Sequence, residues 1–178
     1  MHKNDVEALN NFLFTLKWIL AVTKRYPGNI RFGLVHIFTG NSYKLGNNYG
    51  AQEASCKLDE CSAALRNVFR STDIVARDGM DYWILAPYTP ANENITNKIM
   101  GILEEASRNG LDLTDSNIAV FSLPLKDFPY DEDKYSVLNY LHDIKSMCGS
   151  KKACKLLCES ENCLKVEGFH SSTALGLT

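Results

Sequence analysis

The sequence has 178 residues, 45% of them hydrophobic and 22% charged, a composition typical of one folded globular domain and not of a disordered chain. The formal net charge of −2 gives no general attraction to nucleic acid or anionic lipid. No basic run carries interleaved aromatic residues, so we expect no nucleic acid polymer as a partner.

The most apolar window, residues 12–22, is interrupted by Lys17 and is too short to span a bilayer. It also lacks the small-residue cleavage site of a signal peptide. We therefore expect no membrane insertion and a cytoplasmic protein, whose six cysteines are thiols or metal ligands rather than disulfides.

Periodicity and turn residues predict alternating helices and strands in the first 147 residues. Helices are expected over residues 4–24, 51–70, 93–108 and 133–147, and strands over residues 30–38, 74–76, 82–85 and 117–123. Val68 is expected to point inward, Leu138 to share one side of its helix with Val137, Leu141 and Ile144, and the Gly- and Asn-rich residues 39–50 to form a loop. The strand at 30–38 is apolar on both faces, as a central strand covered on both sides would be, and His36 reads as a core histidine. This order predicts an α/β fold, with a mixed sheet flanked by helices.

The two middle strands flank Asp78-Gly79. An Asp-Gly pair between β-prone runs predicts a hairpin with a type I′ turn, since both central residues of that turn need φ > 0. Asp78, Met80 and Asp81 would lie at its tip. Arg70 and Asp73 would lie where the preceding helix meets the first strand, open to a ligand or to water.

This order of elements around a central hairpin resembles the GGDEF domain, the fold of diguanylate cyclases, over residues 4–145. The family signature corresponds here to the run Arg77-Asp78-Gly79-Met80-Asp81-Tyr82-Trp83. The first Gly and the third-position acid, Asp81, are kept, whereas Met80 replaces the second Gly and Tyr82 the fourth-position acid. Upstream matches in order and spacing fall at Asn4, Val6, Glu7, Leu9, Asn11, Tyr49, Gly50, Ala51, Ala54 and Ser55.

The resemblance implies synthesis of cyclic di-GMP from two GTP molecules with divalent metal, which needs oxygen ligands. By spacing, the first metal-binding Asp of the family falls at Phe38, which offers no ligand atom. The guanine-reading Asn falls at Gly46, or at Asn47 after a one-residue shift, and its partner Asp at Ser55. Asp81 is left as a lone acid, so we expect no metal site, no cofactor and no catalysis. Lys145 falls near the family's terminal catalytic Lys, a position equally suited to a solvated lysine.

The family's inhibitory site is an Arg-x-x-Asp motif that binds cyclic di-GMP, and Arg70-Ser-Thr-Asp73 stands at that spacing. Arg pairs bidentately with guanine or phosphate acceptors, and Asp accepts from guanine N–H groups. The chain thus resembles the family's non-catalytic cyclic di-GMP receptors, such as PelD. A further Arg is absent near Gly101, and Arg108 is the nearest candidate. Alternatively, Arg70 caps the helix and Asp73 ends the turn.

Two other functions stay open. The domain could be a nucleotide-independent scaffold for a signalling protein, with a second copy of itself as a further partner. Retained diguanylate cyclase activity is the less favoured reading. Because the resemblance begins within a few residues of Met1, we expect no sensory domain before it.

Residues 148–178 are expected to be a tail added to a domain of residues 1–147. Cys148, Cys154, Cys158 and Cys163 lie close together there, and four thiolates suit a structural zinc or an iron–sulfur cluster. Their spacing matches no paired C-x-x-C motif. Buried or simply solvated thiols are the alternative.

Overall fold

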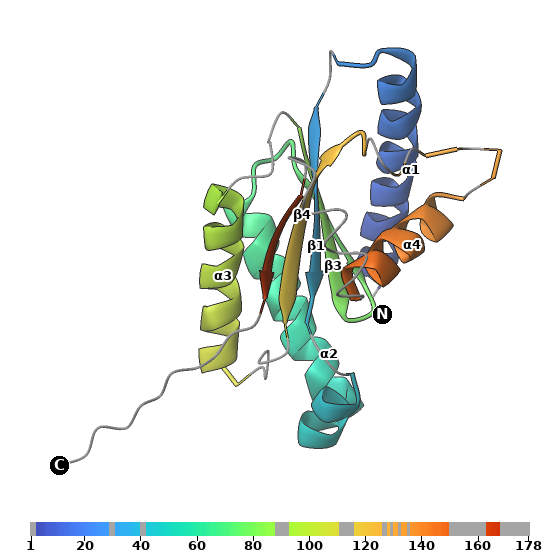
Figure 1. Cartoon of the computed structure of the whole chain (residues 1–178). Coiled ribbons are helices and arrows are strands. Elements are labelled where there is room, and N and C mark those ends of the chain that lie inside the picture. The colour runs from blue at the N-terminus through green and yellow to red at the C-terminus, as the bar shows by residue number, and fades with distance from the viewer. Residues whose placement is uncertain are drawn as a thin grey trace.

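The computed structural model is a five-stranded sheet covered by helices on both faces (Figure 1). It describes residues 3–28, 31–39, 42–87, 93–110, 116–125, 128, 130–131, 133–134, 136–149 and 163–167. The elements are α1 (Lys3–Arg25), β1 (Phe32–Phe38), α2 (Ser42–Val68), β2 (Ile74–Asp78), β3 (Asp81–Pro87), α3 (Glu93–Arg108), β4 (Asn117–Leu123), α4 (Val137–Gly149) and β5 (Cys163–Glu167). The predicted α/β class, with flanking helices and a central hairpin, is confirmed.

The strand order is β2-β3-β1-β4-β5, and every described pair of neighbours is antiparallel. The expectation of a mixed sheet needs this correction. The crossover through α2 joins β1 to β2 with β3 between them, and the crossover through α3 joins β3 to β4 with β1 between them. Each crossover therefore skips one strand, so strands that run in the same direction are never neighbours. This is the split β-α-β arrangement.

Two apolar layers lie on opposite faces of the sheet. Val35 and Ile84 belong to the layer beneath α2 and α3, whereas Leu34 and Trp83 belong to the layer beneath α1 and α4. Alternate residues of one strand point to opposite faces, so β1 contributes side chains to both layers. The prediction that β1 is a central strand covered on both sides is confirmed.

Several predicted boundaries and orientations are wrong. Residues 42–49, expected as loop, are helical, and α2 is kinked at Gly50, whose φ of 75° favours glycine. Helix α4 begins four residues late, because the Ser136 hydroxyl accepts a hydrogen bond from the Asn139 N–H at 3.1 Å and caps it there. Val68 is 44% exposed and does not point inward. Leu138 is 52% exposed and does not share the buried side of Val137, Leu141 and Ile144.

Strand β5 lies inside the expected tail and pairs with β4. Five residues beyond 147 thus extend the sheet, while the division of the chain into domain and tail stays a prediction. Cys148 belongs to α4 and Cys163 to β5; Cys154 and Cys158 lie outside the described residues. Among the described helices, none is long and apolar enough to cross a membrane.

Helix α2 offers a matched test of this packing. Leu65 is fully buried beneath the helix, and Val68 lies on its exposed side. We expect Leu65→Ala to lower the free energy of unfolding by about 2–5 kcal/mol because it leaves a cavity. Val68→Ala should change it by less than about 0.5 kcal/mol. Urea denaturation of both variants measures the difference, and equal losses would contradict the assigned face of α2.

Candidate functional site

The hairpin tip is a tight turn of Gly79 and Met80, because Asp78 pairs directly with Asp81. The predicted turn is therefore displaced by one residue, with Gly79 (φ 63°) as its first central residue. The Met80 carbonyl accepts a hydrogen bond from the Thr39 hydroxyl. Met80 itself is half-buried against the layer beneath α2 and α3. The tip is thus tied to the chain that follows β1.

Arg77 is buried, with 3% of its side chain exposed, and is held by two helices. Its Nη2 lies 3.3 Å from Asp5 Oδ2 of α1 and 3.1 Å from Asp59 Oδ1 of α2. Nη1 donates to the Ser55 carbonyl at 3.5 Å, and Asp5 Oδ1 lies 3.4 Å from Arg66 Nη2. A buried guanidinium needs such anionic and carbonyl partners. Arg77 therefore joins α1, α2 and β2 instead of facing a ligand.

Tyr82, which the resemblance sets at the family's fourth-position acid, is fully buried on the same face as Arg77. Its hydroxyl donates to the Leu58 carbonyl at 2.7 Å. Burial raises the pKa of Tyr82 strongly, and burial also raises the pKa of the adjacent Cys61 thiol to about 11. Tyr82 and Cys61 are therefore part of the core.

Asp81 faces the other layer and is 3% exposed. His36 Nε2 lies 3.5 Å from its Oδ2, and the Lys145 ammonium of α4 forms an ion pair with the same oxygen. His36 in turn stacks on Trp83, with ring centroids 4.2 Å apart. Burial raises the pKa of Asp81, but hydrogen bonds from His36 and Lys145 and their charges outweigh it and hold the pKa below its usual value.

The remaining positions named from the family motif do not form a carboxylate cluster around Asp81. Phe38 is its direct partner across the sheet and offers no oxygen. The Ser55 carbonyl accepts a hydrogen bond from Arg77. Gly46 has no side chain to offer, and the neutral amide of Asn47 cannot replace a carboxylate. In the described part of the chain, no group of three or more His, Cys, Asp or Glu side chains is arranged to hold a metal ion.

Arg70 and Asp73 lie together in a closed turn between α2 and β2. The Arg70 N–H donates to Asp73 Oδ2 at 2.9 Å, and the Asp73 N–H donates to the Arg70 carbonyl at 2.9 Å. The Thr72 hydroxyl lies 3.4 Å from Asp73 Oδ1. The Arg70 side chain is exposed and makes no ion pair with the described residues. The turn therefore sets the carboxylate in place and leaves the guanidinium accessible.

Arg108 cannot join Arg70 within one molecule. It ends α3 beside Asn109, whose carbonyl accepts from Lys57 Nζ at 3.1 Å. From Lys57, α2 runs on for eleven residues to Val68 before Arg70 is reached, a distance of about 16 Å along the axis. Gly101 is exposed on α3, with open space where a Cβ would stand.

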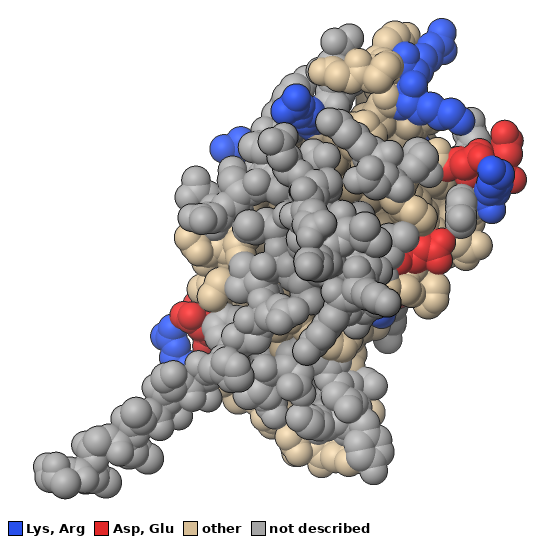
Figure 2. All heavy atoms as spheres, in the orientation of Figure 1, with Lys and Arg blue, Asp and Glu red and all other residues tan. Residues whose placement is uncertain are grey.

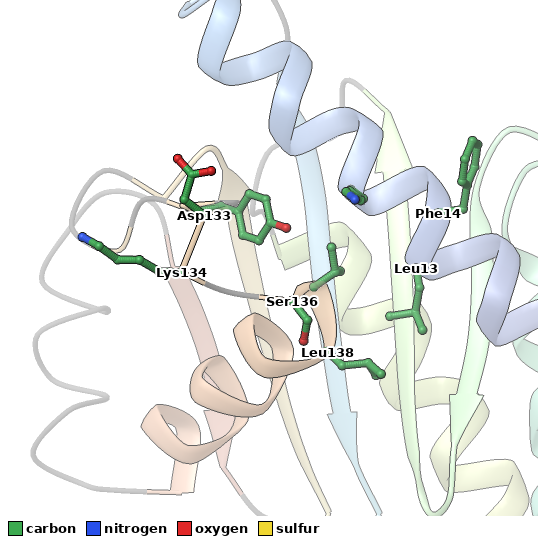
Figure 3. Close-up of a pocket in the computed structure, with 9 residues that line it drawn as sticks. Leu13, Phe14, Asp133, Lys134, Ser136 and Leu138 are labelled. Carbon is green, nitrogen blue, oxygen red and sulfur yellow. The ribbon is translucent and has the colours of Figure 1, made fainter.

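Two hollows lie on the face of α1 and α4. A groove of about 580 Å³ runs between α1 and the start of α4, with Leu13 pointing toward Leu138 inside it (Figure 3). A smaller cavity of about 270 Å³ lies beside the hairpin and includes Asp78, Trp83 and Lys145 in its wall. Neither includes Arg70 or Asp73. The exposed Asp78 thus lies at a surface hollow next to the buried Asp81 pair.

Asp5 and Asp59 were not expected in the site. Asp5 stands at helical spacing from Leu9, Phe12 and Leu16, so the stripe itself places it on the buried side of α1. A buried carboxylate needs a cation or hydrogen-bond donors beside it. Arg77 of the hairpin is the buried cation that pairs with Asp5. No comparable pattern in the sequence marks Asp59.

No protein-family model and no curated protein matches the sequence. Among solved structures, the GGDEF domain of YfiN (TpbB) from Pseudomonas aeruginosa superposes with a TM-score of 0.53 at 16% identity, covering 78% of this chain and 84% of that one. The coiled coil and GGDEF domain of DgcB from Caulobacter crescentus, solved with cyclic di-GMP, gives 0.55 at 13% identity, covering 82% and 74%. The chain has a GGDEF-like fold.

A further match is the diguanylate cyclase SiaD from Pseudomonas aeruginosa, solved in complex with its activator SiaC. It gives a TM-score of 0.51 at 14% identity, covering 75% of this chain and 54% of SiaD. At sequence identities of 13–16%, these structures show that the chain shares their fold.

The ion pairs of Asp81 predict a pH dependence. Because the pKa of Asp81 is lowered in the folded state, its charged form stabilises the protein above its unfolded pKa of about 3.9, and this stabilisation is lost as the pH falls through the folded pKa. We expect Asp81→Asn to lower the free energy of unfolding by about 1–3 kcal/mol above about pH 5, and the difference from wild type to shrink below about pH 4. Denaturant titrations across this range measure it; a constant difference would contradict the ion pairs.

The two described free thiols should differ in reactivity. Cys61 is buried with a pKa of about 11, whereas Cys56 is exposed. Since the thiolate is the reactive form, iodoacetamide should modify Cys56 and leave Cys61 unmodified in the native protein. Peptide mass spectrometry reads both sites, with the denatured protein as the control in which both react. Rapid native labelling of Cys61 would show that the layer under α2 and α3 opens readily.

Proposed function

We propose that this chain is a non-catalytic signalling domain that binds cyclic di-GMP at the Arg70–Asp73 turn. The observation that carries the proposal is the exposed Arg70 guanidinium beside an Asp73 carboxylate that the turn already orients. The solved DgcB structure, which has the same fold, contains cyclic di-GMP.

The turn suits guanine recognition. A carboxylate has about four acceptor positions, and the Arg70 N–H and the Thr72 hydroxyl use two of them on Asp73. The remaining positions can accept from the N1–H and N2–H groups of guanine. The guanidinium of Arg70 can pair bidentately with the O6 and N7 acceptors or with a phosphate.

The residues at the hairpin do not fit the metal-dependent chemistry of the family. Phe38 offers no ligand atom, and Tyr82 is a buried hydroxyl bonded to the Leu58 carbonyl. The remaining acid, Asp81, is neutralised by Lys145 and approached by His36. A divalent cation would have to displace a cation of the protein from a buried oxygen.

Calorimetry with cyclic di-GMP tests the proposal. We expect binding by the wild type and at least about tenfold weaker binding by Arg70→Ala, since a charge-assisted hydrogen bond contributes about 1.5–3 kcal/mol. Asp73→Asn keeps an oxygen for the Arg70 N–H but loses the charge and one acceptor, so it should weaken binding similarly without opening the turn. Arg108→Ala removes an exposed arginine from the C-terminal end of α3, far from the turn, and serves as the matched control. Binding that is unchanged in both site variants, or absent from the wild type, overturns the proposal.

A nucleotide-independent interaction domain is the second candidate. It is favoured by the same turn, because Asp73 already accepts hydrogen bonds within its own loop and so has a structural role without any ligand. SiaD, which shares the fold, was solved with a protein activator. A folded wild type that binds no cyclic di-GMP, yet co-purifies with one fixed partner, would select this function.

Residual cyclase activity is tested separately. Incubation with GTP and magnesium or manganese should give no cyclic di-GMP, even at high protein concentration. Product that disappears in Asp81→Ala would show that the hairpin still catalyses, and would contradict the non-catalytic part of the proposal.

A further inference from the structure

The exposed side of helix α1 changes in character halfway along its length. Between residues 5 and 13 the exposed positions are Val6, Glu7, Asn10 and Asn11, a mostly polar set. From residue 14 to the end of the helix they are Phe14, Lys17, Trp18, Ala21, Lys24 and Arg25. The outer side of a surface helix is normally polar, whereas exposed aromatic side chains that lie together mark an interaction surface. This surface is called the basic aromatic face and is defined as Phe14, Lys17, Trp18, Lys24 and Arg25.

The basic aromatic face points away from the sheet. With about 100° between successive residues of a helix, Phe14 and Trp18 are about 40° apart around the axis, on the side opposite the buried Leu16 and Thr23. Phe14 is 76% exposed and Trp18 is 58% exposed. Phe14 and Lys17 also line the groove between α1 and α4, so the face continues as far as the edge of that groove.

Charge is unevenly distributed along the chain, which the net charge of −2 conceals. Residues 8–52 contain no Asp or Glu, and their five basic residues are Lys17, Lys24, Arg25, Arg31 and Lys44. All 21 acidic residues lie outside this run. The second half of α1 and the strand that follows it therefore form a locally positive part of a weakly negative protein, and local charge decides what a surface attracts.

The three cations of the face are available to an anion outside the protein. None of Lys17, Lys24 and Arg25 forms an ion pair with a residue that the structure describes, and the Arg25 guanidinium lies 5.7 Å from the Tyr26 ring centroid. Figure 2 shows Lys and Arg side chains gathered at the upper end of the molecule, where α1 ends in Figure 1. The end of α1 thus presents positive charge and aromatic surface together.

We propose that the basic aromatic face binds the surface of an anionic lipid bilayer, with no segment crossing it. Aromatic side chains, Trp above all, favour the boundary between headgroups and acyl chains, so Phe14 and Trp18 enter that layer. Lys17, Lys24 and Arg25 surround them and reach the lipid phosphates. Each Lys or Arg beside an anionic bilayer strengthens binding by about fivefold.

The shape of the face favours a bilayer over a nucleic acid strand. A single strand is held in a basic groove with aromatic side chains for its bases, whereas this face is the outer side of one helix at the flank of the molecule (Figure 1). The groove beside it is lined by Leu13, Val137 and Leu138 and includes the acid Asp133. Leu138 is 52% exposed and adds apolar surface next to the face.

The acids across the groove do not cancel the attraction. Asp133 and Lys134 line its far wall, and Lys134 Nζ lies 3.3 Å from Asp131 Oδ2. These three side chains carry one net negative charge, against three positive charges on the basic aromatic face. The surface that meets the bilayer is therefore positive, and its attraction to lipid should weaken as salt screens it.

Tryptophan fluorescence of the full chain tests the contact directly. The chain has two tryptophans, and Trp83 is 2% exposed, so a change on adding vesicles reports on Trp18. With phosphatidylcholine vesicles containing about one third phosphatidylglycerol, we expect emission at shorter wavelength and protection from acrylamide quenching. Vesicles of phosphatidylcholine alone should give neither effect, and added salt should reverse both.

Vesicle sedimentation of variants identifies the residues responsible. Lys17→Gln/Arg25→Gln should bind about 25-fold more weakly, fivefold for each cation, and Phe14→Ser at least about tenfold more weakly, because less apolar surface is buried. Lys98→Gln/Arg108→Gln is the matched control, since it removes two exposed cations from α3 on the other face of the sheet. Its affinity should stay within about twofold of wild type. Circular dichroism confirms that each variant is folded.

Three results overturn the proposal: no vesicle binding by the wild type at low salt, equal binding with and without phosphatidylglycerol, or a face variant that binds no more weakly than the α3 control. Binding of poly(U) RNA, but not of vesicles, would also overturn it and assign the face to nucleic acid. Because these variants leave Arg70 and Asp73 unchanged, failure here leaves the proposed nucleotide site untouched.

Discussion

The buried guanidinium of Arg77 is the interaction on which the arrangement of this domain depends. It is the point where the first helix, the long helix α2 and the edge strand β2 meet, through Asp5, Asp59 and the Ser55 carbonyl. Removing one partner from such a buried group costs about 3–5 kcal/mol, because the remaining charge has no water to replace it. The position of α1 against the sheet edge is therefore fixed by charge as well as by apolar contact, and the hairpin cannot shift without disturbing two helices.

The same hairpin carries a second ionic cluster on its other face. Asp81, His36 and Lys145 link β3, β1 and α4. Each face of the short hairpin is therefore tied to a helix by an ion pair of a buried side chain, Arg77 on one face and Asp81 on the other. Tyr82 adds a hydrogen bond to α2. A hairpin that resembles a ligand-binding tip in the sequence is thus a structural element of the core. What remains accessible is the turn at the opposite end of β2, where Arg70 and Asp73 lie.

Much of this could be predicted from local pattern. The limits of α3 and β4 follow from Glu93, Asn109-Gly110 and Pro124, and the hairpin follows from Asp78-Gly79. The kinked start of α2 could not, since glycines and asparagines at 46–50 indicate loop, and tertiary contacts such as the Tyr49 hydroxyl on the Gly110 carbonyl override that preference. The antiparallel pairing of the strands could not be predicted for a different reason. It depends on which strand each crossover skips, and no residue in the sequence indicates this.

The candidate site likewise has a part that local sequence predicts and a part that it does not. The Arg-x-x-Asp spacing correctly placed Arg70 and Asp73 in one turn, because that geometry is local. The partners of Arg77 and Asp81 come from segments 18 to 72 residues away, and only burial in the folded chain brings them together. The helical stripe of α1 marks Asp5 as buried but does not name its partner, and nothing in the sequence around Lys145 marks its pairing with Asp81. Their role exists only in three dimensions.

The skipped-strand topology also sets the order in which the domain can assemble. His36 of the central strand β1 pairs with Trp83 of β3 on one side and with Ala119 of β4 on the other. Both partners lie far later in the sequence, so β1 is synthesised long before either neighbouring strand. On the ribosome, β1 has no strand to bond with until β3 has emerged, and its second edge stays open until β4 follows. Contacts between residues so far apart in sequence slow folding. We therefore expect cooperative folding to begin only once the hairpin is complete.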